Sequence, residues 1–138
     1  MDSSILQVKR KADLTMEFKD NEAIYLQIAN KVSENILLGK WKEEDKIPSV
    51  RDLASEMQVN PNTVIRTYEF LENQQIIYTK RGLGFFVSKG AVGKIKKYKR
   101  ESFLDSDLPE FFKNMLLLGI EVSEISKRFE DFKSNYSS

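Results

Sequence analysis

The feature that most constrains this chain is the order of its periodic segments between residues 24 and 88. Branched aliphatic residues recur every four positions from Ile24 to Ile36, which predicts a helix that starts near Asn21 and ends at Gly39. Two shorter helices, separated by the turn at residues 58–59, and then a hairpin follow. The predicted order is a helix, a second helix, a tight turn, a third helix and a hairpin. This is the order of elements in a winged helix-turn-helix. We therefore expect a mainly α-helical fold with a small β-hairpin wing.

Capping signals mark the starts of the second and third helices. Ser49 can cap the second helix, and Asp52 adds a carboxylate to its first turn. Asn60 is a suitable cap for the third, and Pro61 is favoured at the first helical position. This third helix is expected to run to about Asn73. Its buried face is predicted to comprise Val64, Tyr68 and Leu71.

The β-prone runs at residues 76–79 and 85–87 flank a glycine-containing loop, so they predict the hairpin. A further short strand is predicted at residues 14–18. After the hairpin the pattern indicates helices at about 91–104, 107–118 and 121–134. These boundaries predict an N-terminal arm at residues 1–20, a winged helix-turn-helix domain at 21–90, and a C-terminal helical dimerisation tail at 91–138.

The composition argues against catalysis. The chain has no cysteine and no histidine, so thiolate chemistry, the usual general base and the commonest metal ligand are all missing. One acidic cluster, Asp105, Asp107 and Glu110, is expected to cap a helix start. The other, at residues 43–45, is expected to lie in a solvated loop. We therefore predict a protein that is not an enzyme and that uses neither a metal nor another cofactor.

The first eleven residues contain no apolar stretch of signal-peptide length, and the longest strongly apolar run, residues 115–118, is far too short for a bilayer. The chain is therefore expected to be cytoplasmic and to make no contact with a membrane.

Several separated motifs between residues 22 and 88 resemble the DNA-binding domain of GntR-family regulators. They are Ile24-Tyr25-Leu26-Gln27-Ile28, the run from Lys46 to Ala54, Val59-Asn60-Pro61-Asn62-Thr63-Val64, and the wing sequence Arg81-Gly82-Leu83-Gly84. The Asn-Pro-Asn-Thr version and the short tail are similar to the YtrA-type subfamily. Gln75 departs from the family pattern, which has glycine there, and a left-handed helix end would strain a glutamine slightly.

This resemblance implies a transcription regulator that binds double-stranded DNA. It further implies that the regulator is a repressor and that its target is an operon for a membrane transporter. Two other functions are compatible with the fold. A winged helix can bind protein without binding specific DNA. A dimeric sensor could bind a small molecule through its helical tail, in addition to binding DNA.

The predicted DNA-binding residues lie at two helix starts and at the wing. Arg51 stands in the first turn of its helix, where a cation opposes the helix dipole, so a phosphate or guanine partner would explain it. Arg66 could contact DNA or pair with Glu69 or Glu72, and a solvated hairpin is the alternative for the wing. The full predicted set is Ser49, Arg51, Asn60, Pro61, Asn62, Thr63, Arg66, Lys80, Arg81 and Gly82.

The last two predicted helices carry more apolar residues than they can bury alone. Such a face left exposed would favour aggregation, and pairing with a second copy removes that problem. The predicted homodimer interface comprises Phe111, Phe112, Met115, Leu116, Leu118, Ile125, Phe129 and Phe132. A two-fold dimer presents two recognition helices, so the expected operator is an inverted repeat.

Overall fold

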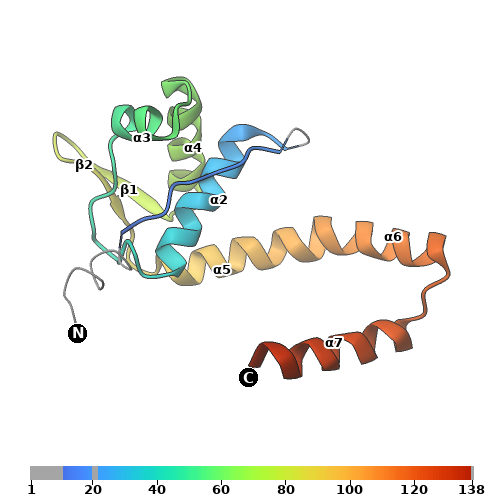
Figure 1. The fold of residues 1–138 in the computed structure, drawn as a ribbon. Helices are drawn as coiled ribbons and strands as arrows, with labels where there is room; N and C mark the ends of the chain where they lie inside the picture. Colours follow the sequence, from blue (N-terminus) through green and yellow to red (C-terminus); the bar gives the residue numbers. More distant parts are fainter. Residues whose placement is uncertain (1–10, 20–21, 138) are drawn as a thin grey trace. The chain divides into compact units, whose positions relative to one another are not determined.

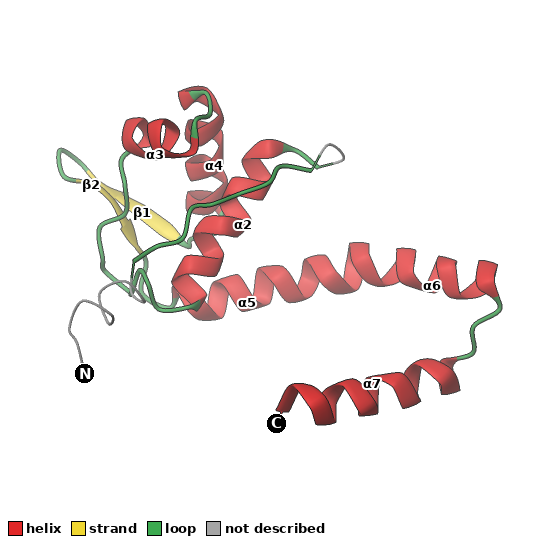
Figure 2. Cartoon of the chain, in the orientation of Figure 1, coloured by secondary structure: helices red, strands yellow, loops and turns green. Residues whose placement is uncertain are grey.

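The computed structural model describes residues 11–19 and 22–137. Figure 1 traces the elements along the chain, and Figure 2 distinguishes helices from strands. In order they are α2 (Ile24–Leu37), α3 (Val50–Met57), α4 (Pro61–Asn73), β1 (Ile77–Lys80), β2 (Gly84–Val87), α5 (Ala91–Ser102), the π-helical turn η1 (Phe103–Asp107), α6 (Leu108–Leu118) and α7 (Val122–Ser137). The predicted mainly helical fold with a two-stranded wing is confirmed. The chain forms two compact units, Met1–Tyr98 and Lys99–Ser138.

The core of the first unit forms between α2 and α4. The four-residue spacing of Ile28, Val32 and Ile36 places these side chains on one face of α2, and all three are buried. They join Tyr68 and Leu71 of α4 in a single hydrophobic cluster. This packing sets the position of α4, whose opposite face is left exposed.

Residues 11–19 are held against α2 by two buried amide side chains. The Asn35 side chain accepts a hydrogen bond from the Asp13 N–H (2.9 Å) and donates one to the Asp13 carbonyl (3.0 Å). Gln27 makes the same pair of bonds with Lys19, at 2.8 and 2.9 Å. The prediction of a strand at residues 14–18 is wrong. This part of the backbone is anchored at both ends by helix side chains and has no strand partner in the described residues.

Helix α4 ends at Asn73, as predicted, and its expected inner face is buried. The hydroxyl of Tyr68 donates a 2.6 Å hydrogen bond to the carbonyl of Pro48, the residue just before the α3 cap. Burial raises the pKa of Tyr68, so this hydroxyl stays protonated and remains a donor. The bond therefore ties the start of α3 to the middle of α4.

The hairpin forms where the sequence predicts it. Strands β1 and β2 pair antiparallel, with Ile77 opposite Val87. Residues 44–47 run along the other edge of β2, where the N–H of Ile47 donates to the carbonyl of Phe85 at 3.0 Å. The polar connection before α3 therefore supports the base of the wing.

The C-terminal end of α4 has the left-handed geometry that disfavours glutamine. Gln75 has φ +61°, and the Ile76 N–H donates to the Leu71 carbonyl at 2.9 Å, as in a Schellman motif. A β-carbon in the left-handed region is strained, whereas glycine adopts it freely.

We expect Gln75→Gly to raise the free energy of unfolding by about 0.5–1 kcal/mol, because relief of strain exceeds the added entropy of the unfolded chain. Chemical denaturation of the full chain measures this. The matched control is Gln74→Gly, because Gln74 has φ −81° and gains nothing from glycine, so this variant should be less stable than the parent. A less stable Gln75→Gly protein would contradict the prediction.

In the second unit the chain remains helical where a break was predicted near residues 105–106. The N–H of Leu108 donates to the carbonyl of Phe103, which is the wider π-helical pattern. Pro109 explains the widening, because it has no N–H and its ring clashes with the carbonyl four residues earlier. Asp107 consequently has helical backbone angles and makes no side-chain cap, contrary to the expected role of its cluster.

Gly119 ends α6 in the left-handed conformation, with φ +66°, before α7 begins at Val122. No helix in the described ranges combines the length and the apolar character that a bilayer span requires.

Candidate nucleic-acid interface

The first turn of α4 presents polar side chains to solvent. Asn60 acts as the predicted cap, since its Oδ1 accepts a 2.8 Å hydrogen bond from the Asn62 N–H, and Pro61 occupies the first turn. The Asn62 side chain is exposed and has no partner among the described residues. An amide with a free donor and acceptor can bond to an adenine edge or to phosphate. Thr63 is half-buried beside it.

The first turn of α3 adds a cation. Ser49 caps this helix as predicted, with its Oγ accepting a 3.1 Å hydrogen bond from the Asp52 N–H. Arg51 is exposed, and within residues 11–19 and 22–137 it forms no ion pair. Its charge is therefore available to an anion.

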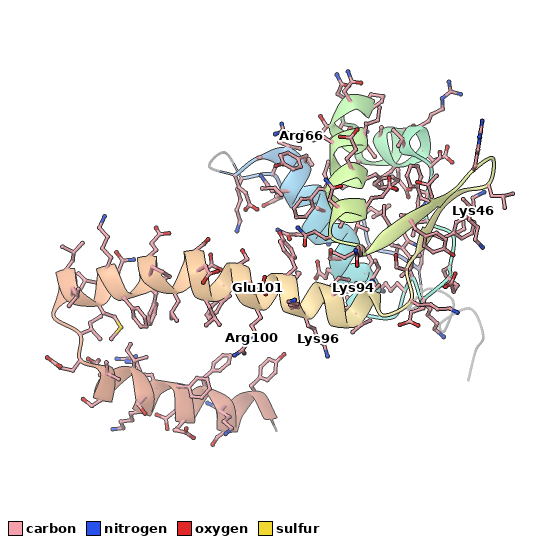
Figure 3. The ribbon with its side chains drawn as sticks, turned by 180° about the vertical axis from the view of Figure 1, so that it is seen from behind. Lys46, Arg66, Lys94, Lys96, Arg100 and Glu101 are labelled. Atoms are coloured by element: carbon pink, nitrogen blue, oxygen red, sulfur yellow. The ribbon has the colours of Figure 1, made fainter. Side chains whose placement is uncertain are left out.

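Arg66 lies one helical turn beyond Asn62, and its guanidinium is 4.0 Å from the centre of the Tyr25 ring. In the described part of the chain it forms no ion pair with Glu69 or Glu72, so the alternative role considered for Arg66 is not observed. Figure 3 shows Arg66 on the side of α4 next to the start of α2.

The wing carries two more cations, Lys80 at the end of β1 and Arg81 in the loop that follows. Arg81 and Gly82 are exposed, and Gly82 has φ +79°. The Lys80 Nζ lies 4.6 Å from the centre of the Phe86 ring, so this lysine packs along the strand instead of extending freely from the loop. Lys46 lies beside the same hairpin (Figure 3), with its Cε 3.1 Å from where a Cβ on Gly84 would lie.

These residues belong to one compact unit. Figure 1 places α3 and the start of α4 at one end of that unit, with the hairpin loop projecting beside them. The arrangement combines cations and uncommitted amide or hydroxyl groups on exposed backbone turns. It can bind a polyanion and also distinguish hydrogen-bonding groups on it.

Sequence reasoning assigned no role to Tyr25 or Lys46, which the structure adds to this surface. Tyr25 and Lys46 lie in runs whose only signal in the sequence is the resemblance to a family. Its contact with Arg66 joins residues far apart in the chain, and helical periodicity carries no signal for such a contact.

Each of the three acidic side chains at residues 43–45 accepts a hydrogen bond from another residue. The Glu43 carboxylate accepts a 2.8 Å hydrogen bond from the Gly90 N–H, and the Glu44 carboxylate accepts one from the Tyr78 hydroxyl. Asp45 accepts a 2.8 Å bond from the Lys42 N–H. Among the residues that the structure describes, no group of three suitable side chains could hold a metal ion.

The predicted dimer residues divide into two groups. Met115 is 7% exposed and Ile125 is half-buried, so both contribute to packing within one chain. The others are exposed, with Leu116 reaching 84%. An open recess of about 410 Å³ lies where α6 turns into α7, lined by Phe112, Met115, Leu116, Gly119, Ile120, Glu121 and Val122.

Comparison with known proteins adds independent information. The model of the bacterial regulatory proteins of the gntR family matches residues 24–87. YhcF, an HTH-type transcriptional regulator of Bacillus subtilis (strain 168), is 34% identical over 116 residues, which cover 84% of this chain and 94% of YhcF. The HTH-type transcriptional repressor YtrA of the same organism is 31% identical over 117 residues, covering 85% of this chain and 89% of YtrA.

Among solved structures, a GntR-family protein from Bacteroides thetaiotaomicron superposes with a TM-score of 0.71 and 46% sequence identity. The match covers 83% of this chain and 99% of that one. The likeness thus extends beyond the winged helix-turn-helix into the C-terminal helices.

Proposed function

This chain belongs to the GntR family and is a DNA-binding transcriptional regulator of the short YtrA type, and from that premise we propose that it is a cytoplasmic repressor that binds an inverted-repeat operator as a homodimer. Its family consists of regulators and not of enzymes. The relative YtrA is named a repressor, and the match covers 89% of its length. Membership of a DNA-binding family also disfavours the alternative of a winged helix that binds only protein.

The observation that carries the DNA-binding assignment is the set of uncommitted polar groups at two helix starts. Asn62 and Arg51 have no side-chain partner in the described residues. Each lies in the first turn of its helix, where backbone N–H groups have no partner within the helix and favour an anion. A polar side chain with a purely structural role would be hydrogen-bonded or would cap its helix, as the side chains of Ser49 and Asn60 do. In the proposed complex the start of α4 lies in the major groove, while Arg51 and Arg81 contact the backbone or the minor groove.

The dimer is supported by the apolar residues of the second unit. Phe111, Phe112 and Leu118 of α6 and Phe129 and Phe132 of α7 are all exposed in the single chain. Their contact with the same residues of a second copy would remove this apolar surface from water. We assign this face to the homodimer.

The proposal predicts the form of the operator. Because a two-fold dimer carries two recognition helices, DNA selected from a random duplex library should contain two inverted half-sites with centres about 34 Å apart, or a multiple of that distance. The mass of the complex should correspond to two chains per duplex. A single asymmetric site bound by one chain would contradict the dimer and the operator symmetry together.

The repressor assignment has its own test. A reporter gene with the selected operator placed across its promoter should be less active when the protein is present. The Asn62→Ala variant provides the matched control because it should fold but bind the operator weakly. Higher reporter activity with the parent protein would show that the protein is an activator.

A further inference from the structure

Tyr25 is the aromatic partner of a residue on the proposed DNA surface. The Arg66 guanidinium carbon lies 4.0 Å from the centre of the Tyr25 ring, within the range of a cation–π contact. A guanidinium that stacks through its face keeps its N–H donors, which lie in its plane, for other partners. The Tyr25 contact can therefore hold Arg66 in place without using the groups that would bind DNA.

Tyr25 is itself held firmly by α4. The hydroxyl of Thr67, which is completely buried, lies 3.0 Å from two carbonyl oxygens, those of Tyr25 and Thr63, and shares its single hydrogen between them. The rings of Tyr25 and Phe70 pack edge to face, with ring centres 6.3 Å apart. Backbone and ring are thus both anchored, so Tyr25 can act as a rigid support.

An open recess of about 360 Å³ lies beside the stacked pair. Its lining comprises Ala23, Ile24, Tyr25, Asn62, Thr63 and Arg66. The recess leaves room for a ligand group next to the guanidinium and next to the polar start of α4. The stacked Arg66 therefore faces the same space as Asn62 and Thr63.

We propose that Tyr25 is a positioning residue for DNA recognition: its ring orders Arg66 beside the start of α4 before DNA arrives, so that Arg66 contacts one fixed position of each half-site. This inference rests on the proposed function, because it needs Arg66 to contact DNA. A free arginine loses much rotamer freedom when it binds, and an arginine ordered in advance loses less. Loss of the ring should therefore weaken DNA binding and also reduce the discrimination between base pairs at that position.

The test measures fluorescence anisotropy on the selected operator and on operators with each base pair changed in turn. Tyr25→Leu should lower affinity about twofold to fivefold per half-site and flatten the preference at the same position as Arg66→Ala. Tyr25→Phe keeps the ring and should bind like the parent. In the double variant, Tyr25→Leu should add little to Arg66→Ala, because the ring acts through the arginine.

The matched control is Tyr98→Leu, which removes a tyrosine that packs against Phe70, with ring centres 5.4 Å apart, and not against Arg66. It should keep the base preference of the parent, and thermal unfolding of every variant reports any loss of folded protein. If Arg66→Ala impairs binding but Tyr25→Leu binds like the parent, binds more tightly or adds its full effect in the double variant, the positioning role is wrong. If Arg66→Ala itself binds like the parent, the proposed DNA contact of Arg66 fails as well.

Discussion

Replacement of both Phe129 and Phe132 by glutamate should convert the protein to monomers and lower its affinity for operator DNA by at least about a hundredfold. These side chains are 60% and 63% exposed in the single chain, so the substitutions remove little packing from their own unit. In the proposed dimer they are covered by the partner, where unpaired carboxylates are strongly unfavourable. A monomer can occupy only one half-site at a time and loses the advantage of simultaneous binding to two.

The control for this prediction is Ser123→Glu with Ser134→Glu. Both serines are exposed and lie on the opposite side of α7, so the control adds the same charge to the same helix without touching the apolar face. Light scattering should show a dimer for the control and a monomer for the phenylalanine variant. A stable dimer of the phenylalanine variant with unchanged operator affinity would mean that the interface lies elsewhere.

Combined removal of Arg51 and Arg81 should weaken binding to all DNA sequences by at least about a hundredfold, and should lower the slope of log affinity against log salt by about three to four units. The reason is that each arginine is expected to contact phosphate, which gives four contacts in the dimer. Each lost contact removes the release of about one counterion. If Arg81 lies in a narrow minor groove instead, its loss should depend on the A·T content of the flanking sequence.

Asn62→Ala should behave differently, because an amide at the start of α4 reads base edges in the proposed complex. We expect it to weaken the free energy of operator binding by about 1–3 kcal/mol per half-site, relax the base preference at one position, and leave the salt slope unchanged.

Arg128→Ala is the charge control for the Arg51 and Arg81 variant, since Arg128 pairs with Glu124 at 3.2 Å on α7. Arg128→Ala removes one charge per chain and the Arg51 and Arg81 variant removes two, so a salt-slope change for Arg128→Ala half that of the Arg51 and Arg81 variant would show that the effect is only one of net charge.

Features that depend on neighbours in the chain could be predicted from the sequence. The Asn60 cap, Pro61 and the end of α4 at Asn73 are specified by residues within a few positions of each other. The hairpin is similar, because its two β-prone runs are separated by only a short loop. The predicted site residues on α3, α4 and the wing follow from these local elements, and only their roles require experiment.

Features that depend on distant contacts could not be predicted. In the sequence, Asn35 and Gln27 are ordinary polar residues of a predicted helix. In the structure, their amide side chains form hydrogen bonds with the backbone of residues 11–19. Met115 belongs to the same apolar run as its exposed neighbours, and only its packing separates it from them. The contact of Arg66 with Tyr25 is also distant in the chain, and the glutamates nearby in sequence suggested a different partner.

The most direct test of the central claim is the operator affinity of a single protein in which Arg51, Asn62, Arg66 and Arg81 are all alanine. Circular dichroism and light scattering should show that this variant has the fold and the oligomeric state of the parent, because all four side chains are exposed. Anisotropy titration should then give it no greater affinity for the selected operator than for a scrambled duplex. Operator binding equal to that of the parent would contradict the assignment of α3, α4 and the wing as the DNA-binding surface.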